Sequence, residues 1–591
     1  MVSSFHLFPN VIACKRWSHL IIAQTASGSE LASATAGMQA FGRASDRTTW
    51  YTLAGRPIRL GGLAVDTVRA AAQRASFWRF DVPLETSVLL RILGSQKRLC
   101  DGASRREMLV SGALSLGGVT LAELLAARSA QAETAGLRSR SFGKAKACIL
   151  LYLWGSPSQL ETFDIKPRAP LEIRGEYGKG IASSIAGYRV GELLPKTAAI
   201  VDQTTIVRSL THPYPLHGIE LAVTGIPQLG QRFSDPHDMR SWPFIGSVVD
   251  YVQGARSPGR IPEVPRNIAM PWPFSSRRSG EVLRSGPYGG FLGPAYDPIW
   301  TDFQGAASAA SAEVTASFGG VTKTYRDPYG GMTPDSSLAL AAAGQLSGGV
   351  TIDRLNTRRT LLQQFDQERE RLDRTPSAQS FNRYQQIAHS MLTSPRVSNA
   401  IDVSREAESV RQQYGGNLFG HSCLAARRLI EAGSTFVTVF WDEYESVNSA
   451  WDTHEDHFNR MKNQLCPSFD QAYPVLLRDL EERGLLDETL VVCISEHGRT
   501  PKIDDSPGGG RNHWSRAYSA IFAGGGFAQG RVIGQTDAIA GDVADNPFSP
   551  NDILATVYHL LGIDHEMLLQ DRLGRPLPVV AEGRVRAELL A

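Results

Sequence analysis

Glu496 and His497 are adjacent residues whose side chains could bind a cation or transfer a proton. They follow Thr489–Ile494 (TLVVCI), a short β-branched run that is typical of a buried central strand. In an open α/β sheet, ligands bind beyond the carboxyl ends of the strands. A carboxylate and an imidazole placed there are ligands for a hard cation or for zinc, or an acid–base pair. The alternative is a surface turn with no part in binding or catalysis.

Further acidic and histidine side chains fall in loops at the predicted ends of other strands. In a mostly parallel sheet these strand ends gather at one edge. Carboxylates and imidazoles collected there would repel one another or stay unpaired unless a cation lay among them. The pattern therefore predicts a metal site, and the alternative is a set of hydrogen-bonded surface residues and caps. The residues are Asp164, Asp452, His454, Glu496 and His513, and the apolar runs are Ala147–Trp154, Ile200–Arg208, Ser434–Phe440, Thr489–Ile494 and Tyr518–Ala523.

Two hydroxyl groups follow the second predicted strand. Ser209 or Thr211 would serve as a nucleophile if a metal or a base lowered the pKa of its hydroxyl. The alternative is that they cap the helix predicted to begin near His217. Further site candidates near these strand ends are His212, His217, His497 and Arg499.

The composition is that of an ordinary globular protein. The chain has 591 residues, of which 42% are hydrophobic and 20% charged, enough for one large domain or two to three smaller ones. A net charge of +2 argues against a surface that coats nucleic acid. The four cysteines after residue 100 show no close paired spacing, which predicts buried thiols rather than a disulfide framework.

The beginning of the chain differs from the rest. Residues 1–100 carry 12 Lys and Arg against 5 Asp and Glu, and they show no sustained helical or strand period. We expect residues 1–103 to be a non-globular leader that adds nothing to the fold, with translation starting later than Met1. A transit-like leader is the alternative.

Residues 104–132 have the layout of a secretory signal peptide. Arg105 and Arg106 precede a short apolar stretch, and Ala130-Gln131-Ala132 is a small-x-small cleavage site. The paired arginines resemble a twin-arginine signal, and the glycine-interrupted apolar stretch is too short for a stable membrane span. We therefore expect export to the periplasm or the exterior, with a mature chain that begins near Glu133.

The mature chain, residues 133–591, reads as alternating strands and helices. A stretch rich in Gly, Pro, Ser and aromatic residues covers about 254–350, which is too long for a plain loop and predicts an insertion or a lid. Near the carboxyl end, Ser549, Pro550 and Asp552 predict the capped start of a helix that continues through Ile553–Leu561.

Long motifs in fixed order then resemble one family. The chain looks like an uncharacterised secreted bacterial family that is related to sulfatases and catalogued as a domain of unknown function. The similarity runs from the signal near Ser104 to about Pro578. The motifs are ILLYLWGSPSQLETFDIKP, IVRSLTH, GPYGGFLGPAYDP, FWDEYESVNSAWDTH, SEHGRTP, RNHW and FSPNDILATVYHLLGI.

This resemblance implies the alkaline-phosphatase-like superfamily, an α/β/α sandwich around a mostly parallel mixed sheet. Members hydrolyse phosphate or sulfate esters with bound divalent metals, here zinc, calcium or magnesium. Asp164 corresponds to the carboxylate after the first strand, and Asp452 and His454 match the Asp-Thr-His motif. Glu496 stands where relatives carry the Asp of Asp-His-Gly, and His513 corresponds to the last histidine ligand.

The sequence also departs from those relatives. Glu replaces Asp at 496, the Asp452-x-His454 spacing is tighter than in typical phosphatases, and no Cys-x-Pro-x-Arg motif supports a formylglycine nucleophile. We expect an exported metal-dependent hydrolase of phosphate or sulfate esters on a small molecule or polysaccharide. Ser209, Thr211 or a water molecule would attack. The alternative is a catalytically silent relative that acts in binding or surface assembly.

Overall fold

The computed structural model describes most of the chain beyond residue 135. The chain divides into two compact units, Met1–Leu121 and Ala122–Ala591. In the second, the described residues are 136 and 139–591, with gaps at 215–217, 228–237, 259, 261, 276, 278–282, 341–382, 384, 389 and 392–393. The predicted signal peptide, residues 104–132, lies outside the described residues.

In the first unit, three short strands form an antiparallel sheet in the order β1-β2-β3. They are β1 (Ala40–Phe41), β2 (Thr48–Leu53) and β3 (Arg56–Gly61). The sequence pattern predicted no regular element there. The run TTWYTL in β2 is rich in residues that favour strands, and β2 pairs with β3 with Thr48 opposite Gly61 and Leu53 opposite Arg56.

A nine-stranded mixed sheet forms the centre of the second unit, in the order β12-β9-β8-β13-β4-β14-β17-β7-β18. Only β12 and β17 run against the other strands. The strands are β4 (Ala147–Leu153), β7 (Thr205–Leu210), β8 (Asn267–Met270), β9 (Ile299–Gln304), β12 (Ser337–Leu340), β13 (Phe436–Trp441), β14 (Thr489–Ile494), β17 (Tyr518–Ala523) and β18 (Arg531–Ile533).

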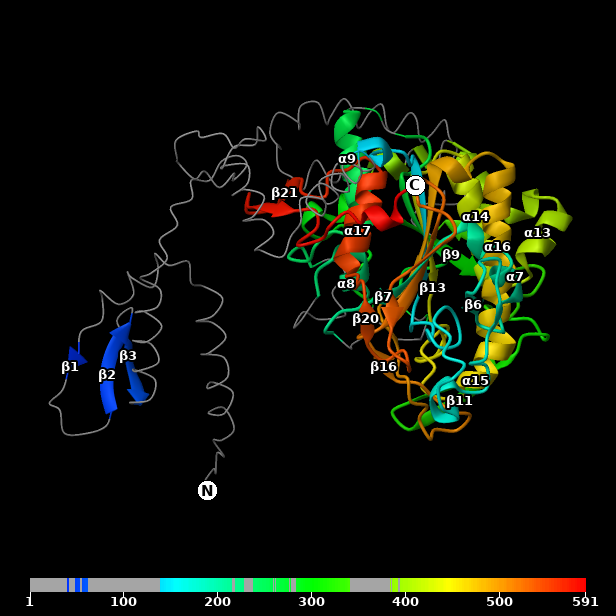
Figure 1. Cartoon of the computed structure of the whole chain (residues 1–591). Helices are drawn as coiled ribbons and strands as arrows, with labels where there is room; N and C mark the ends of the chain where they lie inside the picture. Colours follow the sequence, from blue (N-terminus) through cyan, green and yellow to red (C-terminus); the bar gives the residue numbers. More distant parts are fainter. Residues whose placement is uncertain are drawn as a thin grey trace, which may run out of the picture. The chain divides into compact units, whose positions relative to one another are not determined.

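Helices cover both faces of this sheet (Figure 1). On one side lie α8 (Ile219–Thr224), α9 (Ile245–Arg256) and α17 (Pro550–Leu560), and on the other α14 (Leu418–Glu431) and α16 (Cys466–Glu482). Strands β13, β4 and β14 are buried along their whole length, as expected for central strands covered on both faces. The predicted α/β sandwich around a mostly parallel mixed sheet is therefore confirmed.

The remaining helices and ribbons are short. α7 (Pro195–Ala198) packs on α16, and α13 (Glu408–Tyr414) packs on α14 and α16. The others are α6 (Leu171–Arg174), α12 (Arg396–Ile401), α15 (His457–Arg460), β5 (Ile181–Ala182), β6 (Arg189–Val190), β10 (Glu313–Phe318), β11 (Val321–Arg326), β15 (Gly498–Arg499), β16 (His513–Trp514), β19 (Gln535–Thr536), β20 (Val543–Asp545), β21 (Leu568–Gln570) and β22 (Pro576–Pro578).

The segment predicted as an insertion, about 254–350, contributes to the central sheet. It supplies β8, β9 and β12, and only the β10–β11 ribbon within it forms a separate two-stranded sheet. These strands are short and lie among Gly and Pro residues, so no clear period marks them in the sequence.

The predicted helix cap and the predicted buried cysteines are confirmed. Ser549 and Asp552 form a reciprocal capping box at the start of α17. The described cysteines, Cys148, Cys423, Cys466 and Cys493, are all buried free thiols.

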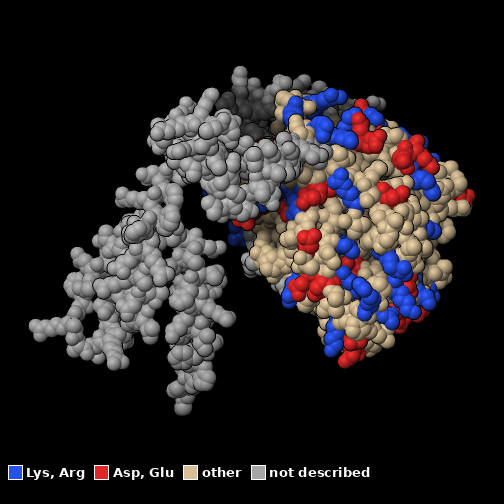
Figure 2. All heavy atoms as spheres, in the orientation of Figure 1, with Lys and Arg blue, Asp and Glu red and all other residues tan. Residues whose placement is uncertain are grey.

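Among the described residues, no helix is long and apolar enough to cross a membrane. On the face that Figure 2 shows, basic and acidic side chains are interspersed, in line with the small net charge.

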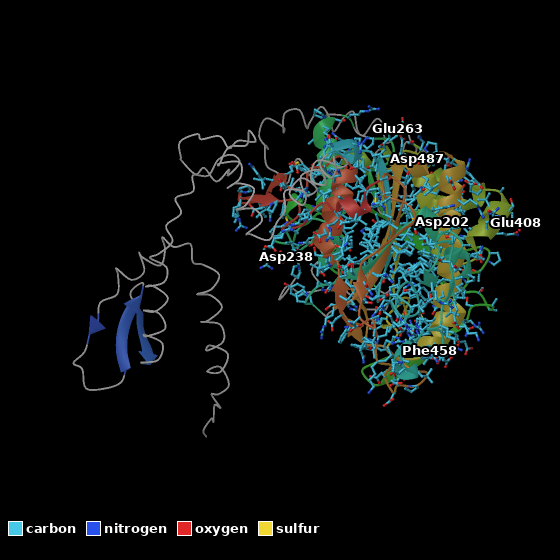
Figure 3. The ribbon with its side chains drawn as sticks, viewed as in Figure 1. Asp202, Asp238, Glu263, Glu408, Phe458 and Asp487 are labelled. Atoms are coloured by element: carbon cyan, nitrogen blue, oxygen red, sulfur yellow. The ribbon has the colours of Figure 1, made fainter. Side chains whose placement is uncertain are left out.

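The two ends of the sheet are marked by labelled side chains in Figure 3. Asp487, just before the amino end of β14, lies at one end of the unit, and Phe458 of α15 lies at the opposite end. The end marked by Phe458 is therefore the carboxyl edge of the parallel strands.

Candidate metal centre

The candidate site lies in loops at the carboxyl edge of β13 and β14. The loop after β13 carries Asp452 and His454, and the turn after β14 leads into the short strand β15. β15 pairs with β16, which places Arg499 opposite His513. Because β17 runs antiparallel, residues that precede it lie at this same edge, and His513 is one of them.

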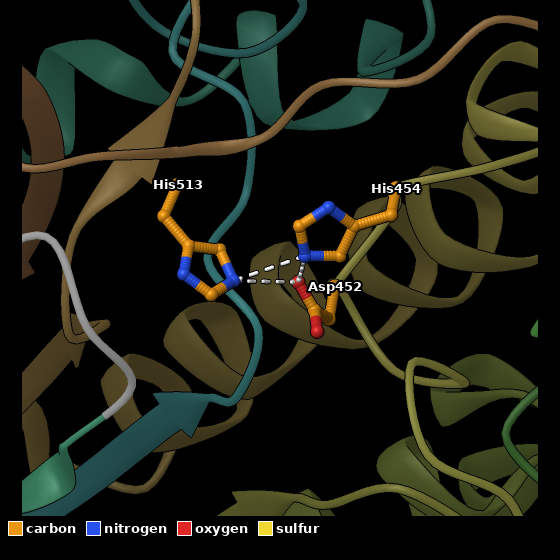
Figure 4. A group of neighbouring side chains, drawn as sticks. All are labelled: Asp452, His454 and His513. Carbon is orange, nitrogen blue, oxygen red and sulfur yellow. Dashed lines mark hydrogen bonds and ion pairs between the residues drawn. The ribbon is translucent and has the colours of Figure 1, made fainter. Parts of the chain in front are cut away.

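Asp452, His454 and His513 meet at this edge (Figure 4). The Nε2 atom of His454 lies 3.0 Å from Asp452 Oδ1 and 3.0 Å from His513 Nε2. His513 Nε2 lies 3.5 Å from the same Asp452 oxygen. Asp452 is buried and the two imidazoles are partly exposed, so the group opens toward solvent on the histidine side.

These distances fit a metal ion. Ligands at about 2.0–2.1 Å from a tetrahedral zinc are separated by about 3.3 Å. The three donor-to-donor distances, 3.0, 3.0 and 3.5 Å, bracket that value. Two imidazole nitrogens and one carboxylate oxygen form a zinc-type donor set, whereas calcium and magnesium prefer oxygen ligands. Among the described residues, no other His, Cys, Asp or Glu joins this group.

Arg499 orients the carboxylate of Asp452. Its buried guanidinium lies 2.5 Å from Asp452 Oδ1 and donates to backbone oxygens of both neighbouring loops, those of Ser156 and Arg511, each at 3.1 Å. Such a charge-assisted bond is short and strong, and it holds the carboxylate in one orientation. The sequence predicted Arg499 as a site candidate, and the structure places it beside a proposed ligand.

Two glycines allow the loops to approach closely. Gly155, with φ of 91°, lies so near the Asp452 loop that a Cβ atom would be 2.1 Å from the backbone nitrogen of Asp452. At Gly510, a Cβ atom would be 1.8 Å from the carbonyl oxygen of His454. A side chain at either position would displace a residue of the candidate site, which is the close backbone approach that only glycine permits.

A buried carboxylate beneath the site connects both ligand-bearing loops. Glu161 Oε1 accepts a bond from Arg511 Nη2 at 2.5 Å, and its Oε2 lies 3.4 Å from His457 Nε2. His457 Nδ1 lies 2.7 Å from the hydroxyl of Thr453, the residue between Asp452 and His454. Glu161 thus holds the 452–454 loop through His457 and the 511–513 loop through Arg511.

The pKa values in this network follow from burial and charge. Burial would raise the pKa of the Glu161 carboxyl, but Arg511 and His457 outweigh it and lower the pKa to about 2. Burial lowers the pKa of the His457 imidazole, although Glu161 opposes the shift. His457 is therefore neutral, its Nε2–H faces Glu161, and its Nδ1 accepts from Thr453. Sequence reasoning missed Glu161, Thr453, His457 and Arg511, because no residue spacing shows which loop side chains turn inward.

Glu496 is placed outside the three-residue group, which corrects the prediction that it would share one ligand sphere with the others. Its carboxylate accepts bonds from Gly155 N at 2.8 Å, Tyr152 Oη at 3.1 Å and Ser495 Oγ at 3.0 Å. Protein donors therefore occupy both oxygens of this carboxylate. Its neighbour His497 lies closer to the group, with its ring centroid 4.7 Å from that of His513.

Asp164 is likewise placed elsewhere. Its carboxylate lies 3.1 Å from Lys166 Nζ and 3.5 Å from Arg208 Nη1, and it accepts a hydrogen bond from Thr536. Two cations and a hydroxyl therefore neutralise Asp164 in place of a metal, so the predicted convergence of five ligands is reduced to three. The loop after β4 turns Glu161, not Asp164, toward the ligand-bearing loops.

The two predicted hydroxyl nucleophiles lie in different environments. Ser209 is fully buried within β7 and donates to the carbonyl oxygen of Asn546 at 2.6 Å. Thr211 is partly exposed, and its backbone nitrogen donates to Phe548. His212 lies with Nε2 2.7 Å from the carbonyl oxygen of Glu496, and burial lowers the pKa of its imidazole. His217 lies outside the described residues.

Comparison with known proteins identifies a family without an assigned activity. Residues 145–590 match the family described as "Protein of unknown function (DUF1501)", which confirms the resemblance seen in the sequence. No curated protein matches the chain.

Several solved structures share a distant likeness. One is the sulfatase PsFucS1 from Pseudoalteromonas sp., at 10% identity and a TM-score of 0.33, covering 78% of this chain and 76% of that one. A second is Ps i-CgsB in complex with k-i-k-neocarrahexaose, at 11% identity, a TM-score of 0.32 and coverage of 71% and 72%. A third is the lipoteichoic acid synthase LtaP from Listeria monocytogenes, at 10% identity and a TM-score of 0.28, covering 76% of this chain and 80% of that one. Likenesses of this size assign no activity to the chain.

Proposed function

The chain belongs to the DUF1501 family, and on this premise we propose that it is an exported, metal-dependent hydrolase of phosphate or sulfate esters. The ester would belong to a small molecule or a polysaccharide. The observation that carries the proposal is the group Asp452, His454 and His513, whose donor atoms lie 3.0–3.5 Å apart at the carboxyl edge of the sheet.

The donor chemistry favours zinc among the three metals that the sequence left open. Two imidazoles suit zinc far better than they suit calcium or magnesium. A divalent cation bound by these three residues would polarise the ester and stabilise negative charge on the displaced oxygen. The protein's part is to fix the three donor atoms, which Arg499 does for the carboxylate of Asp452.

Charge favours an anionic substrate at this site. Arg499 already balances the charge of Asp452. A divalent cation held in addition by two neutral imidazoles would leave a local excess of positive charge. Positive potential in a partly enclosed site raises the local concentration of anions, and phosphate and sulfate esters are anions.

The attacking group is better assigned to Thr211 or to water than to Ser209. The Ser209 hydroxyl is buried, and its proton is donated to the Asn546 carbonyl. Thr211 is partly exposed, and the adjacent His212 contacts the backbone of Glu496 at the site's edge. Of the two hydroxyls, Thr211 is therefore the one with access to a substrate.

A second candidate function is that of a silent binding or surface-assembly protein. One observation favours it: protein groups already compensate the carboxylates of Glu496 and Asp452. A network satisfied in this way folds without a cation, and its position at a strand edge does not require chemistry.

Metal analysis separates the two candidates. We expect the purified full-length protein to bind about one zinc ion per chain, measured by elemental analysis and titration calorimetry. Since loss of a partner that only orients a ligand costs 10–100-fold in affinity, His454→Ala and His513→Ala should each cost at least about 100-fold. His565→Ala is the matched control, because His565 is a partly exposed histidine beside Asp564 and is not a member of the group. The silent candidate would be favoured if the wild-type protein binds no metal and cleaves neither p-nitrophenyl phosphate nor p-nitrophenyl sulfate.

Export is the part of the proposal that depends on residues 104–132. A chain that starts near residue 95 should be exported and cleaved close to Ala132, and replacement of Arg105 and Arg106 by Lys should block this. Cell fractionation with immunoblotting measures both. Normal export of the double variant would reject the twin-arginine assignment.

A further inference from the structure

A short chain of polar side chains leads from the surface to His454. Asn512 Nδ2 lies 3.0 Å from Asp504 Oδ2, and Asn512 Oδ1 lies 2.7 Å from His454 Nδ1. On the far side of the same ring, Nε2 faces Asp452 and His513. The chain therefore joins an exposed carboxylate to the imidazole of a proposed ligand.

The direction of these hydrogen bonds follows from the donors available. An ionised carboxylate only accepts, so the amide nitrogen of Asn512, and not its oxygen, must face Asp504. The amide oxygen then faces His454 and accepts, which requires a proton on Nδ1 of the imidazole. A neutral His454 in this state carries its lone pair on Nε2.

We propose that Asp504 and Asn512 are positioning residues that fix His454 in the Nδ1–H tautomer and so present its Nε2 lone pair to the metal. The tautomer is a property of the protein before any cation binds. Its use for metal binding rests on the proposed function. In the opposite tautomer Nε2 would carry a proton, and it would donate to Asp452 instead of binding a cation.

Backbone bonds hold the two residues in place. Asn512 N lies 3.0 Å from the Thr500 hydroxyl, and Thr500 N lies 2.9 Å from the Asn512 carbonyl oxygen. Asp504 forms a bridge with Gly510, in which Asp504 N donates to Gly510 O at 2.8 Å. The 500–512 loop thus closes on itself beside His454, and both partners keep their register without help from the metal.

The tautomer can be read directly from nitrogen chemical shifts. Full-length, metal-free protein labelled with ¹⁵N-histidine would be measured at a pH at which the ring is neutral, and the His454 signal identified by its loss in His454→Gln. We expect a protonated Nδ1 in the wild type. In Asn512→Ala the population of this tautomer should fall several-fold. Asn463→Ala, which removes an exposed amide bonded to Asn459, is the matched control and should leave it unchanged.

An exchange variant tests the direction of the bonds. In Asp504→Asn with Asn512→Asp, the amide at 504 donates to the carboxylate at 512, which still accepts from His454 Nδ1. We expect this double variant to recover the wild-type tautomer even if Asn512→Ala folds poorly. A wild-type His454 with the proton on Nε2, or an unchanged tautomer in Asn512→Ala, would overturn the proposal.

Zinc titration connects the tautomer to the site. Asn512→Ala should weaken zinc binding about 10–100-fold, as is usual when the partner of a ligating histidine is lost, and the exchange variant should restore it. If the wild-type tautomer is as expected but no zinc binds, the proposed function fails and the assignment of Asp504 and Asn512 to tautomer control stands. If zinc binds equally in wild type and Asn512→Ala, the positioning role is rejected.

Discussion

Replacement of Glu161 by Gln tests whether one buried carboxylate holds both ligand-bearing loops. The side chain of Glu161 is fully buried, as are those of its partners Arg511 and His457. Glutamine keeps the size of the side chain but removes its charge. Arg511 would then remain buried without its counter-ion, and the loop that carries His513 would lose one of its attachments.

The size of the effect follows from the structure. Loss of one partner from a buried ion pair costs roughly 3–5 kcal/mol. The pKa gives a separate figure, since the Glu161 carboxyl is lowered from 4.5 to about 2, which corresponds to about 3 kcal/mol. Because the folded-state pKa is the lower one, this stability is present above pH 4.5 and is lost as the pH falls from about 4.5 to 2.

Urea unfolding of wild type and Glu161→Gln between pH 7 and pH 2.5, followed by tryptophan fluorescence, measures both effects. Glu161→Gln should unfold at a lower midpoint at pH 7, and the gap should close toward low pH. The comparison cancels other titrating groups, such as Asp327, whose pKa is raised to about 7 by burial. Glu488→Gln is the control, because its pair with Lys146 is exposed and worth at most about 1 kcal/mol. A constant gap, or a cost below about 1 kcal/mol at pH 7, would refute the reasoning.

Three further substitutions probe the loops and the nucleophile. Gly155→Ala would place Cβ 2.1 Å from Asp452 N, so it should lower the free energy of unfolding in urea by at least about 2 kcal/mol and weaken zinc binding. Gly416→Ala is the control and should change neither, because a Cβ there would have no atom within 4 Å. Ser209→Ala should lower stability by about 1–3 kcal/mol yet keep ester hydrolysis, and a complete loss of turnover in folded protein would restore Ser209 as nucleophile. Thr453→Val leaves the buried Nδ1 of His457 without its donor, so it should lower the free energy of unfolding by about 1–3 kcal/mol, and a stability equal to wild type would contradict the Thr453–His457 hydrogen bond.

The central strands could be predicted because burial on both faces leaves a continuous apolar run. Thr489–Ile494 and Tyr518–Ala523 match β14 and β17 to the residue. The third predicted strand, Ser434–Phe440, starts two residues and ends one residue before β13, because Ser434 and the backbone nitrogen of Thr435 bond to Pro265 and Arg266, just before β8. The two four-residue strands within 254–350, β8 and β12, could not be recognised, since so short a run among glycines and prolines gives no measurable period.

The site was predictable in part. Asp452, His454 and His513 were expected at one edge because each lies in a loop next to a central strand, and the structure brings them together. The same argument placed Asp164 and Glu496 there, although their side chains are bonded elsewhere. Strand order fixes the edge that a loop reaches. The direction of a loop side chain depends on backbone dihedrals and on the donors it meets, which residue types do not show.

His513 reached the expected edge through a reversal that the sequence did not show. It lies in the loop between β14 and β17, and the antiparallel direction of β17 together with the β15–β16 pairing keeps it at the site's edge. Its loop therefore needs an attachment of its own, which Arg511 and Glu161 supply. A buried ion pair adds little net stability compared with apolar packing, so we infer that this pair serves to position the loop that carries His513. It follows that Glu161→Gln should lower stability and zinc affinity together, whereas Asn512→Ala, at an exposed position, should lower zinc affinity alone.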